Sequence, residues 1–469
     1  MLAGSGLEGT FHTWESGERS RYEENIGGRT DVSLRIGERE YIVNQNGNVR
    51  ELHGLLLARQ RTEDFIARDD FVSQPQYDSY LGEKQLPDGR TVDEVAVAPP
   101  HGQREVVDLD AKTLMVDRTS FDEEDGTSTE DYFDYRTVDG VLIAQREIDS
   151  NGDHVYDVMH LAEHIVVDRP IASEIFAVPQ TTVVQTDKPV TVPLEEHDGH
   201  LYTKVRIGGH SYTFLVDTGA QAVVVDSRVA AQLGLQPQGH LEVSGTTRTG
   251  GLGIADLDSI QIGEASLPVR EVSVLDLQGA TGSFNVDGVL GYPFFAAAEV
   301  TIDPVALTMT FAKPGALHPR GNAIPIDVDR QLVELTGKVN GTEGRFVIDT
   351  GNSTELLLFD PFMRAHPYVV AFQPRSLARD YGVGGSAPAV NATIDELDVG
   401  TFRLFNRYAN LMLTNRGAFA DRFDAGNIGM GTLRNFIVTF DLSNERMFMQ
   451  PSAVFDDGSR RPRYERVTP

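Results

Sequence analysis

Short stretches in which apolar and polar residues alternate run through residues 1–185. Thr30–Ile36 and Glu40–Asn44 are examples, and a period of two interrupted by turn-forming residues is typical of antiparallel strands. A helix is predicted around Glu51–Phe65, and the acidic stretch Asp122–Asp134 is interpreted as a solvated turn and strand edge. We therefore predict a mostly antiparallel β domain in residues 1–185.

From Pro189 onward the pattern of apolar and polar residues occurs twice. In each copy an apolar strand ends in the same triplet, which is Asp217-Thr218-Gly219 in the first and Asp349-Thr350-Gly351 in the second. A single triplet could be an ordinary turn, because Asp and Gly both favour turns. The matched apolar residues before both triplets favour a duplication instead.

Two matched pairs of segments follow the triplets: Gly288–Gly291 with Gly426–Gly429, and Val300–Asp303 with Val438–Asp441. Within the first pair, Asn427 stands where the first copy has Val289. The spacing between copies grows from 132 residues at the aspartates to 138 at the last glycines, which a surface loop can absorb. We predict two mainly β lobes, at residues 186–320 and 321–469.

Composition agrees with a multidomain globular protein. The 469 residues correspond to roughly three domains of ordinary size, and 40% hydrophobic and 8% aromatic residues can fill their cores. No segment approaches the ~18 consecutive apolar residues of a transmembrane helix. The formal net charge of −29 argues against a nucleic-acid partner, and the absence of cysteine excludes disulfides, thiolate metal sites and a cysteine nucleophile.

Two aspartates brought together from the two copies could form a paired-carboxylate site. Carboxylates about 3 Å apart cannot both ionise easily, so the pair shares one proton. The ionised member can act as general base on a water molecule, while the protonated member polarises a carbonyl group. Because such a pair titrates as a unit, the sequence does not assign the base role to Asp217 or to Asp349.

The segment from about Pro189 to Pro451 resembles the retropepsin-like and pepsin-like aspartic proteases, and most of all their bacterial members with two lobes in one chain. The two Asp-Thr-Gly triplets and the later glycine-containing segments carry the resemblance. It implies a mainly β fold of duplicated acid-protease lobes, with Asp217 and Asp349 as the catalytic pair. It implies neither a metal nor an organic cofactor.

The same resemblance gives roles to residues around the pair. Thr218 and Thr350 would brace the two loops through their hydroxyls, and Gly219 and Gly351 would allow the loops to approach closely. A glycine-rich hairpin in each copy would cover the substrate, with these residues: Gly245, Thr246, Thr247, Gly382, Val383 and Gly384.

The residue after each triplet departs from the pepsin-like pattern, which favours Ser or Thr there. It is Ala220 in the first lobe and Asn352 in the second. We expect this difference to affect the substrate preference and the optimum pH more than the type of reaction. We expect an aspartic endopeptidase that binds a polypeptide in extended conformation as an added strand. Because both aspartates lie in one chain, dimerisation is not required for activity.

Residues 1–185 show a fainter similarity to the LolA-like lipoprotein carriers, through their strand pattern and the closing segment Ile171–Pro179. This similarity implies a periplasmic, cell-envelope or secreted location. Met1–Gly6 has neither the basic nor the apolar region of a signal peptide, so we interpret it as a truncated or mature start. An alternative function is a cell-envelope lipid- or protein-binding protein with non-proteolytic lobes.

Three further patterns could suggest a metal site, and each has a simpler interpretation. His160–His164 matches a zinc motif that requires a helix, but its surroundings predict a strand, on which the two histidines would lie over ~10 Å apart. Asp149–Asp153 resembles the start of a calcium loop but lacks the later Gly and Glu, so we predict a turn. His197, His200 and His210 flank a hairpin and are interpreted as solvated.

Overall fold

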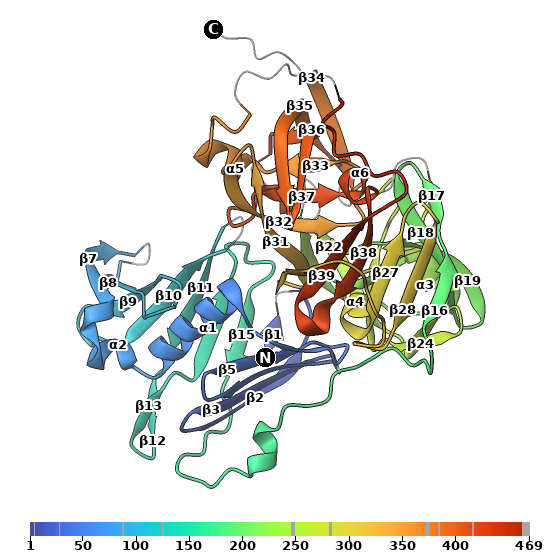
Figure 1. Cartoon of the computed structure of the whole chain (residues 1–469). Coiled ribbons are helices and arrows are strands. Elements are labelled where there is room, and N and C mark those ends of the chain that lie inside the picture. The colour runs from blue at the N-terminus through green and yellow to red at the C-terminus, as the bar shows by residue number, and fades with distance from the viewer. Residues whose placement is uncertain are drawn as a thin grey trace. The chain divides into compact units, whose positions relative to one another are not determined.

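The structure is a computed structural model and is mainly β, as the sequence predicted (Figure 1). It describes residues 1–461 except 4, 28, 87–88, 124–125, 245–248, 281–283, 371–375, 383–384 and 415–416. The chain divides into a first unit, Met1–Gln45 with Val49–Gln180, and a second unit, Asn46–Asn48 with Thr181–Pro469. In the part of the chain that the structure describes, every helix is too short or too polar to span a membrane.

The first unit contains two large antiparallel sheets. The smaller is a meander of five strands: β2 (Gly9–Ser16), β3 (Arg19–Ile26), β4 (Arg29–Ile36), β5 (Arg39–Val43) and β6 (Val49–Glu51). The larger has eight strands in the order β1 (Leu2–Ala3), β15 (Val158–Leu161), β14 (Arg146–Ser150), β11 (Thr127–Phe133), β10 (Val116–Asp122), β9 (Glu105–Asp110), β8 (Thr91–Val97) and β7 (Asp78–Gln85).

The predicted helix is confirmed with later bounds. Helix α1 spans Gly54–Ala67, whereas Glu51 is the last residue of β6, and a short helix, α2 (Asp70–Ser73), follows. Phe65 and Ile66 of α1 are buried in one cluster with apolar residues of β8 and β9. The helix is therefore held by its apolar side, as expected for an amphipathic helix against a sheet.

The interpretation of Asp122–Asp134 as a solvated turn and strand edge was wrong for Thr127–Phe133, which form β11. Strand β11 pairs with β10 on one side and with β14 on the other, so it lies inside the sheet. Arg118 on β10 binds the carboxylate of Asp131 on β11 through two hydrogen bonds, of 2.6 and 3.0 Å. Cross-strand pairs of opposite charge stabilise a sheet, so an acidic strand can occupy an inner position.

Glu105 is the first residue of β9 and is 1% exposed. Burial, reinforced by the negative charge of Glu63, raises the pKa of Glu105 from an ordinary value of 4.5 to about 9. Between these values the folded protein retains a proton that the unfolded chain has released. The stability linked to Glu105 is therefore fully present below about pH 4.5 and is lost as the pH rises toward 9.

We predict that Glu105→Gln makes the stability of the first unit less dependent on pH over this range. The change in slope should approach about 1.4 kcal/mol per pH unit, because the amide cannot ionise. Trp14, the one tryptophan of the sequence, lies on β2, so its fluorescence in urea titrations at several pH values reports on this unit. Glu83→Gln, at an exposed position of β7, is the control, and equal slopes for Glu105→Gln and wild type would contradict the prediction.

The second unit contains three large sheets. A six-stranded sheet takes strands from both halves of the unit, in the order β16 (Val190–Pro193), β28 (Thr308–Ala312), β27 (Glu299–Asp303), β38 (Phe436–Asp441), β39 (Arg446–Pro451) and β29 (Ala323–Pro325). Its centre is the antiparallel pair β27–β38, where the hydroxyls of Thr301 and Thr439 lie 2.8 Å apart. The two strands contain the last pair of matched segments of the repeat, Val300–Asp303 in β27 and Val438–Asp441 in β38.

The other two sheets each contain one triplet-bearing strand. One sheet has the order β21 (Gln238–Ser244), β22 (Thr249–Asp256), β25 (Glu271–Leu275), β20 (Val223–Asp226), β26 (Gly288–Leu290), β19 (His210–Val216), β18 (His200–Ile207), β23 (Ser259–Ile262) and β24 (Ala265–Pro268), with β17 (Glu195–His197) beside β18. The other has the order β30 (Asp327–Asp329), β31 (Leu332–Val339), β32 (Thr342–Asp349), β37 (Gly426–Gly429), β33 (Leu356–Leu358), β36 (Phe402–Met412), β35 (Gly385–Val399) and β34 (Ser376–Gly382).

The same pairing order surrounds both triplets. Strand β19 lies between β18, which is antiparallel to it, and β26, which is parallel, and β26 also pairs with β20. Strand β32 likewise lies between β31 and the parallel β37, which also pairs with β33. Each triplet thus follows a strand that has a hydrogen-bonded neighbour on both sides, which fixes the position of its backbone.

One hydrophobic cluster extends through both halves of the second unit. Phe214 and Phe346, at corresponding places on β19 and β32, are both fully buried in it. The rings of Phe295 and Phe440 meet edge to face with centroids 5.5 Å apart, one from each half. Because the two halves share this core and the six-stranded sheet, the loops with the triplets are held in fixed positions.

Candidate active site

The two predicted aspartates stand at the ends of corresponding strands. Asp217 directly follows β19, and Asp349 is the last residue of β32. Each carboxylate accepts a hydrogen bond from the N–H two residues later, with 2.8 Å from Gly219 N to Asp217 Oδ1 and 2.8 Å from Gly351 N to Asp349 Oδ1. Each aspartate residue keeps some exposure to solvent, although the carboxyl group of Asp217 lies deep among protein atoms.

The glycines of the triplets face the carboxylate of the opposite lobe. A Cβ atom at Gly219 would lie 2.5 Å from Asp349 Cγ, and one at Gly351 would lie closer still to Asp217 Cγ. A side chain at either position would therefore collide with the other aspartate. The close approach that was predicted for these glycines is present, and it brings Asp217 and Asp349 together.

The two threonines of the triplets join the loops through four hydrogen bonds. The Thr218 hydroxyl donates to the Ile348 carbonyl at 2.6 Å and accepts from the Thr350 N–H at 3.0 Å. The Thr350 hydroxyl makes the same two bonds in reverse, to the Val216 carbonyl at 2.9 Å and from the Thr218 N–H at 3.0 Å. Both side chains are buried, so these bonds are shielded from water.

Thr218→Val is expected to lower the free energy of unfolding of the second unit by about 2–4 kcal/mol. The substitution keeps the shape but leaves the Ile348 carbonyl and the Thr350 N–H without partners, at about 1–3 kcal/mol for each buried group. The measurement is chemical denaturation followed by circular dichroism. Thr191→Val is the matched control, because the Thr191 hydroxyl makes a 2.8 Å bond to Thr310 at an exposed place on β16. Equal losses for the two variants would refute the bracing role.

The two carboxylates influence each other's protonation. Burial raises the pKa of Asp217 well above its usual range, and the negative charge of Asp349 and a hydrogen bond between the two side chains raise it further. The N–H groups of Gly219 and Gly351 act in the opposite direction, because they favour the charged form. A buried acid beside a second carboxylate can keep one proton for the pair at neutral pH, as general acid–base chemistry requires.

Comparison with protein families gives a match that contains the first triplet. A family model described as aspartyl protease matches residues 203–294. This segment is similar to aspartyl proteases. It runs from β18 to helix α4 (Tyr292–Ala297) and so includes Asp217 and β26, whereas Asp349 lies outside it. A search of the curated proteins finds no match to the chain. A protease role is thus supported in outline for the second unit.

The hairpins predicted to cover the substrate are described only in part. Gly245, Thr246, Thr247, Val383 and Gly384 lie outside the described residues. The strands on either side are present, since β21 pairs with β22 and β34 pairs with β35. Gly382 is the last residue of β34 and pairs with Gly385, the first residue of β35.

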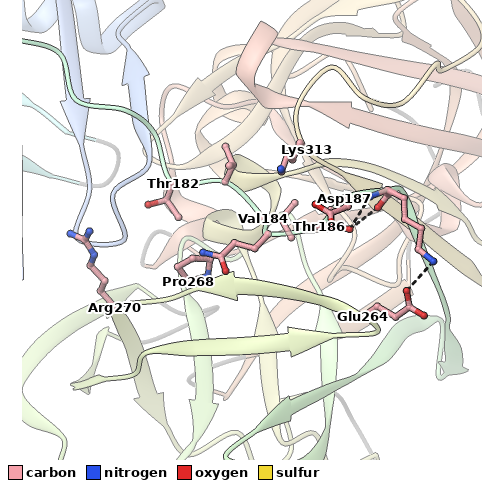
Figure 2. A pocket seen from close by; sticks show the side chains of 11 residues that line it. Thr182, Val184, Thr186, Asp187, Glu264, Pro268, Arg270 and Lys313 are labelled. Carbon is pink, nitrogen blue, oxygen red and sulfur yellow. Dashed lines mark hydrogen bonds and ion pairs between the residues drawn. The ribbon is translucent and has the colours of Figure 1, made fainter.

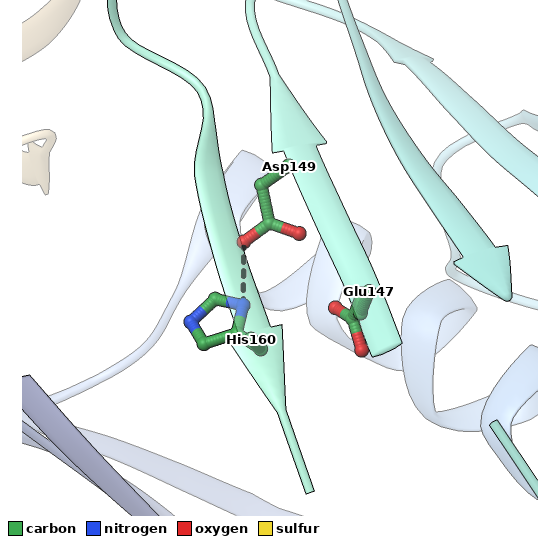
Figure 3. A group of neighbouring side chains, drawn as sticks. All are labelled: Glu147, Asp149 and His160. Carbon is green, nitrogen blue, oxygen red and sulfur yellow. Dashed lines mark ion pairs between the residues drawn. The ribbon is translucent and has the colours of Figure 1, made fainter. Parts of the chain in front are cut away.

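Two of the three candidate metal patterns have the simple structures that the sequence favoured, but the interpretation of His197, His200 and His210 as solvated was wrong in part. His200 Nδ1 is buried and burial lowers the pKa of His200, while the ring of His197 stacks on Phe284 with centroids 4.1 Å apart. His160 lies on β15, so His160–His164 is not on a helix, and Asp149–Asp153 leads from β14 into a turn. Figure 3 shows His160 beside Asp149 and Glu147, whose ligand atoms lie within 4.8 Å of one another. Both His160 nitrogens already have partners, because Nε2 lies 3.3 Å from the Tyr22 hydroxyl and Nδ1 lies 3.5 Å from Asp149. We interpret the group as an ion-paired, buried histidine.

A separate hollow of about 880 Å³ lies in the second unit (Figure 2). It is lined by the segment Thr182–Lys188 together with Glu264, Pro268, Arg270 and Lys313. Lys188 and Glu264 form an ion pair of 3.1 Å at its rim. The lining includes no residue of either triplet, and its mixed charges do not favour one class of ligand.

Two side chains at the site were given no role by the sequence. Asn427 on β37 donates a short hydrogen bond to Asp349 Oδ2, and Asn352 donates to Asn427 Oδ1 at 3.0 Å. The available signal was the asymmetry between the copies, because the corresponding residues of the first lobe are Val289 and Ala220. The sequence shows that the two copies differ at these two positions, but it does not show the hydrogen bonds that Asn352 and Asn427 make.

Proposed function

We propose that the protein is an aspartic endopeptidase in which Asp217 and Asp349 form one catalytic pair. The observation that carries the proposal is the reciprocal approach of the two triplets, in which each glycine faces the carboxylate of the other lobe and each threonine binds the other loop. The match of residues 203–294 to aspartyl proteases supports the reaction class.

In this proposal one carboxylate is ionised and the other protonated. The ionised carboxylate removes a proton from a water molecule held between the two, and the water oxygen attacks the carbonyl carbon of the peptide bond. The protonated carboxyl donates its hydrogen bond to the carbonyl oxygen, which gains negative charge as the bond forms. Proton transfer to the amide nitrogen then allows the C–N bond to break, without a covalent enzyme intermediate.

We propose an extended polypeptide as the substrate, bound by main-chain hydrogen bonds as in other cases of strand addition. The test is digestion of a mixture of unfolded proteins from about pH 3 to 8 by wild type and by Asp217→Asn, with the new chain ends identified by mass spectrometry. Ends produced by wild type alone would support the function and give the specificity. An identical pattern for both proteins, or no new ends at any pH, would contradict it.

A further inference from the structure

We propose that Asn427, oriented by Asn352, holds the negative charge of the catalytic pair on Asp349 and thereby leaves the shared proton on Asp217. This makes Asp349 the general base and Asn427 a positioning residue that acts through it. The inference rests on the proposed function for its catalytic meaning. It concerns an asymmetry between two lobes that are otherwise matched at the triplets.

The hydrogen bonds around the two carboxylates are unequal. Asp349 accepts from Gly351 N–H at 2.8 Å and Asn352 N–H at 3.1 Å on Oδ1, and from the Asn427 side chain on Oδ2. At Asp217 the Gly219 N–H donates to Oδ1 at 2.8 Å and the Gly351 N–H also favours the charged form, but no side-chain amide among the described residues donates to this carboxylate. Hydrogen bonds to a carboxylate favour its charged form, and a pair that shares one proton places the charge where the donors are.

The donating direction of Asn427 follows from its neighbours. The Thr354 N–H donates to Asn352 Oδ1 at 2.9 Å, and a backbone N–H cannot accept. The oxygen of Asn352 therefore faces Thr354, and its amide nitrogen faces Asn427 Oδ1 at 3.0 Å. The amide nitrogen of Asn427 must then point to Asp349. The chain of bonds removes the ambiguity between amide oxygen and nitrogen that an isolated asparagine would have.

Among the described residues of the first lobe there is no counterpart of the Asn352–Asn427 relay. Val289 occupies the position of Asn427 on the matching strand β26 and is buried in an apolar cluster with Tyr202 and Leu215. Ala220 occupies the position of Asn352 and packs against the same cluster. Carbon side chains at these two places cannot donate to Asp217, so among the described groups only the backbone N–H groups of Gly219 and Gly351 offset the burial of its carboxyl. The raised pKa of Asp217 agrees with this geometry.

The test compares wild type with Asn427→Leu and Asn352→Leu. Removing the donor makes ionisation of Asp349 less favourable, so the acid limb of the kcat/KM profile should move upward by about one to two pH units in Asn427→Leu. Asn352→Leu should give a smaller shift in the same direction, because Asn427 keeps its amide but loses its orientation. In both variants, kcat/KM on the plateau at pH values above the acid limb should fall less than kcat/KM at pH values on the limb.

Asn444→Leu is the matched control, because the Asn444 amide donates to both oxygens of Asp441 at 2.9 Å, far along the chain from the triplets. It should leave the acid limb unchanged. A wild-type limb position in Asn427→Leu, with circular dichroism showing a folded protein, would overturn the proposal while leaving the proposed function intact.

A second readout does not depend on peptide cleavage. In protein labelled with ¹³C at the aspartate carboxyls, the signals of Asp217 and Asp349 are assigned with the two Asp→Asn variants and followed by NMR from about pH 3 to 8. As the pH rises, the Asp349 signal should shift at a lower pH than the Asp217 signal. In Asn427→Leu the difference between these two pH values should become smaller or change sign. Ionisation of Asp217 first in wild type would refute the proposal even if the protein cleaved no peptide.

Discussion

Asp217→Asn, Asp349→Asn and the double variant are expected to lose nearly the same large share of peptide hydrolysis, about 10³-fold or more in kcat. In the proposed mechanism the two carboxylates share one proton, so each needs the other for its role, and the close approach of the two triplets supports this. An amide at either position can neither remove a proton from water nor share the proton of its partner. Removing the second carboxylate after the first should therefore add little.

The measurement is the initial rate of cleavage of a peptide identified from the protein digest, for the four proteins side by side. Asp303→Asn is the control, because Asp303 ends β27 and accepts from the Val305 and Ala306 N–H groups of the following turn at 3.0 and 2.9 Å. Effects of the two single substitutions that multiply in the double variant would show that the aspartates act independently. That result would exclude the shared-proton site.

Arg345→Met is expected to destabilise the second unit by about 3–5 kcal/mol, because it removes one of the two arginines, Arg345 and Arg330, that pair with a group of buried carboxylates. Arg345 is only 15% exposed and lies 2.7 Å from Asp424, 3.0 Å from Glu334 and 3.1 Å from Asp329. Burial raises the pKa of Asp424 to about 6, with the charge of Asp421 adding to the effect, while Arg345 lowers it. The guanidinium thus favours the ionised form of a carboxylate that has lost its contact with water.

The loss should be smaller at low pH than at neutral pH. Without Arg345 the pKa of Asp424 rises above its present value of about 6, so the folded variant has to bind a proton that the unfolded chain has released at neutral pH. As the pH falls below the unfolded value, both states are protonated and this part of the loss disappears. Denaturant titrations of wild type and variant at about pH 4 and pH 7 measure the difference.

Arg403→Met is the matched control for this prediction. Arg403 also pairs with two carboxylates, Asp398 at 3.0 Å and Glu396 at 3.3 Å, but its side chain is 59% exposed. Exposed pairs contribute at most about 1 kcal/mol, so this variant should unfold almost as wild type does. Similar losses for Arg345→Met and Arg403→Met would show that burial of the network around Arg345 has no energetic consequence.

The strand pattern and the repeated triplets were accessible from the sequence because both depend on neighbours along the chain. A period of two identifies the faces of a strand, so the β character and the strands before Asp217 and Asp349 could be predicted. Helix α1 was predicted for the same reason, with an error of a few residues at its start. The position of β11 inside its sheet was missed, because the cross-strand partner Arg118 cannot be recognised from local composition.

The amino-acid sequence by itself determined the mainly β fold, the two Asp-Thr-Gly triplets and the residues that differ between the two copies. Only the tertiary structure decided which of those residues meet. The threonines bind the opposite loop, the glycines face the opposite aspartate, and Asn427 reaches Asp349 while Val289 is enclosed in an apolar cluster. The physical reason is that hydrogen bonds and burial depend on distances between residues that lie far apart along the chain, 78 positions for Asn427 and Asp349 and 132 for the two threonines. Strand pairing and the shared core set these distances.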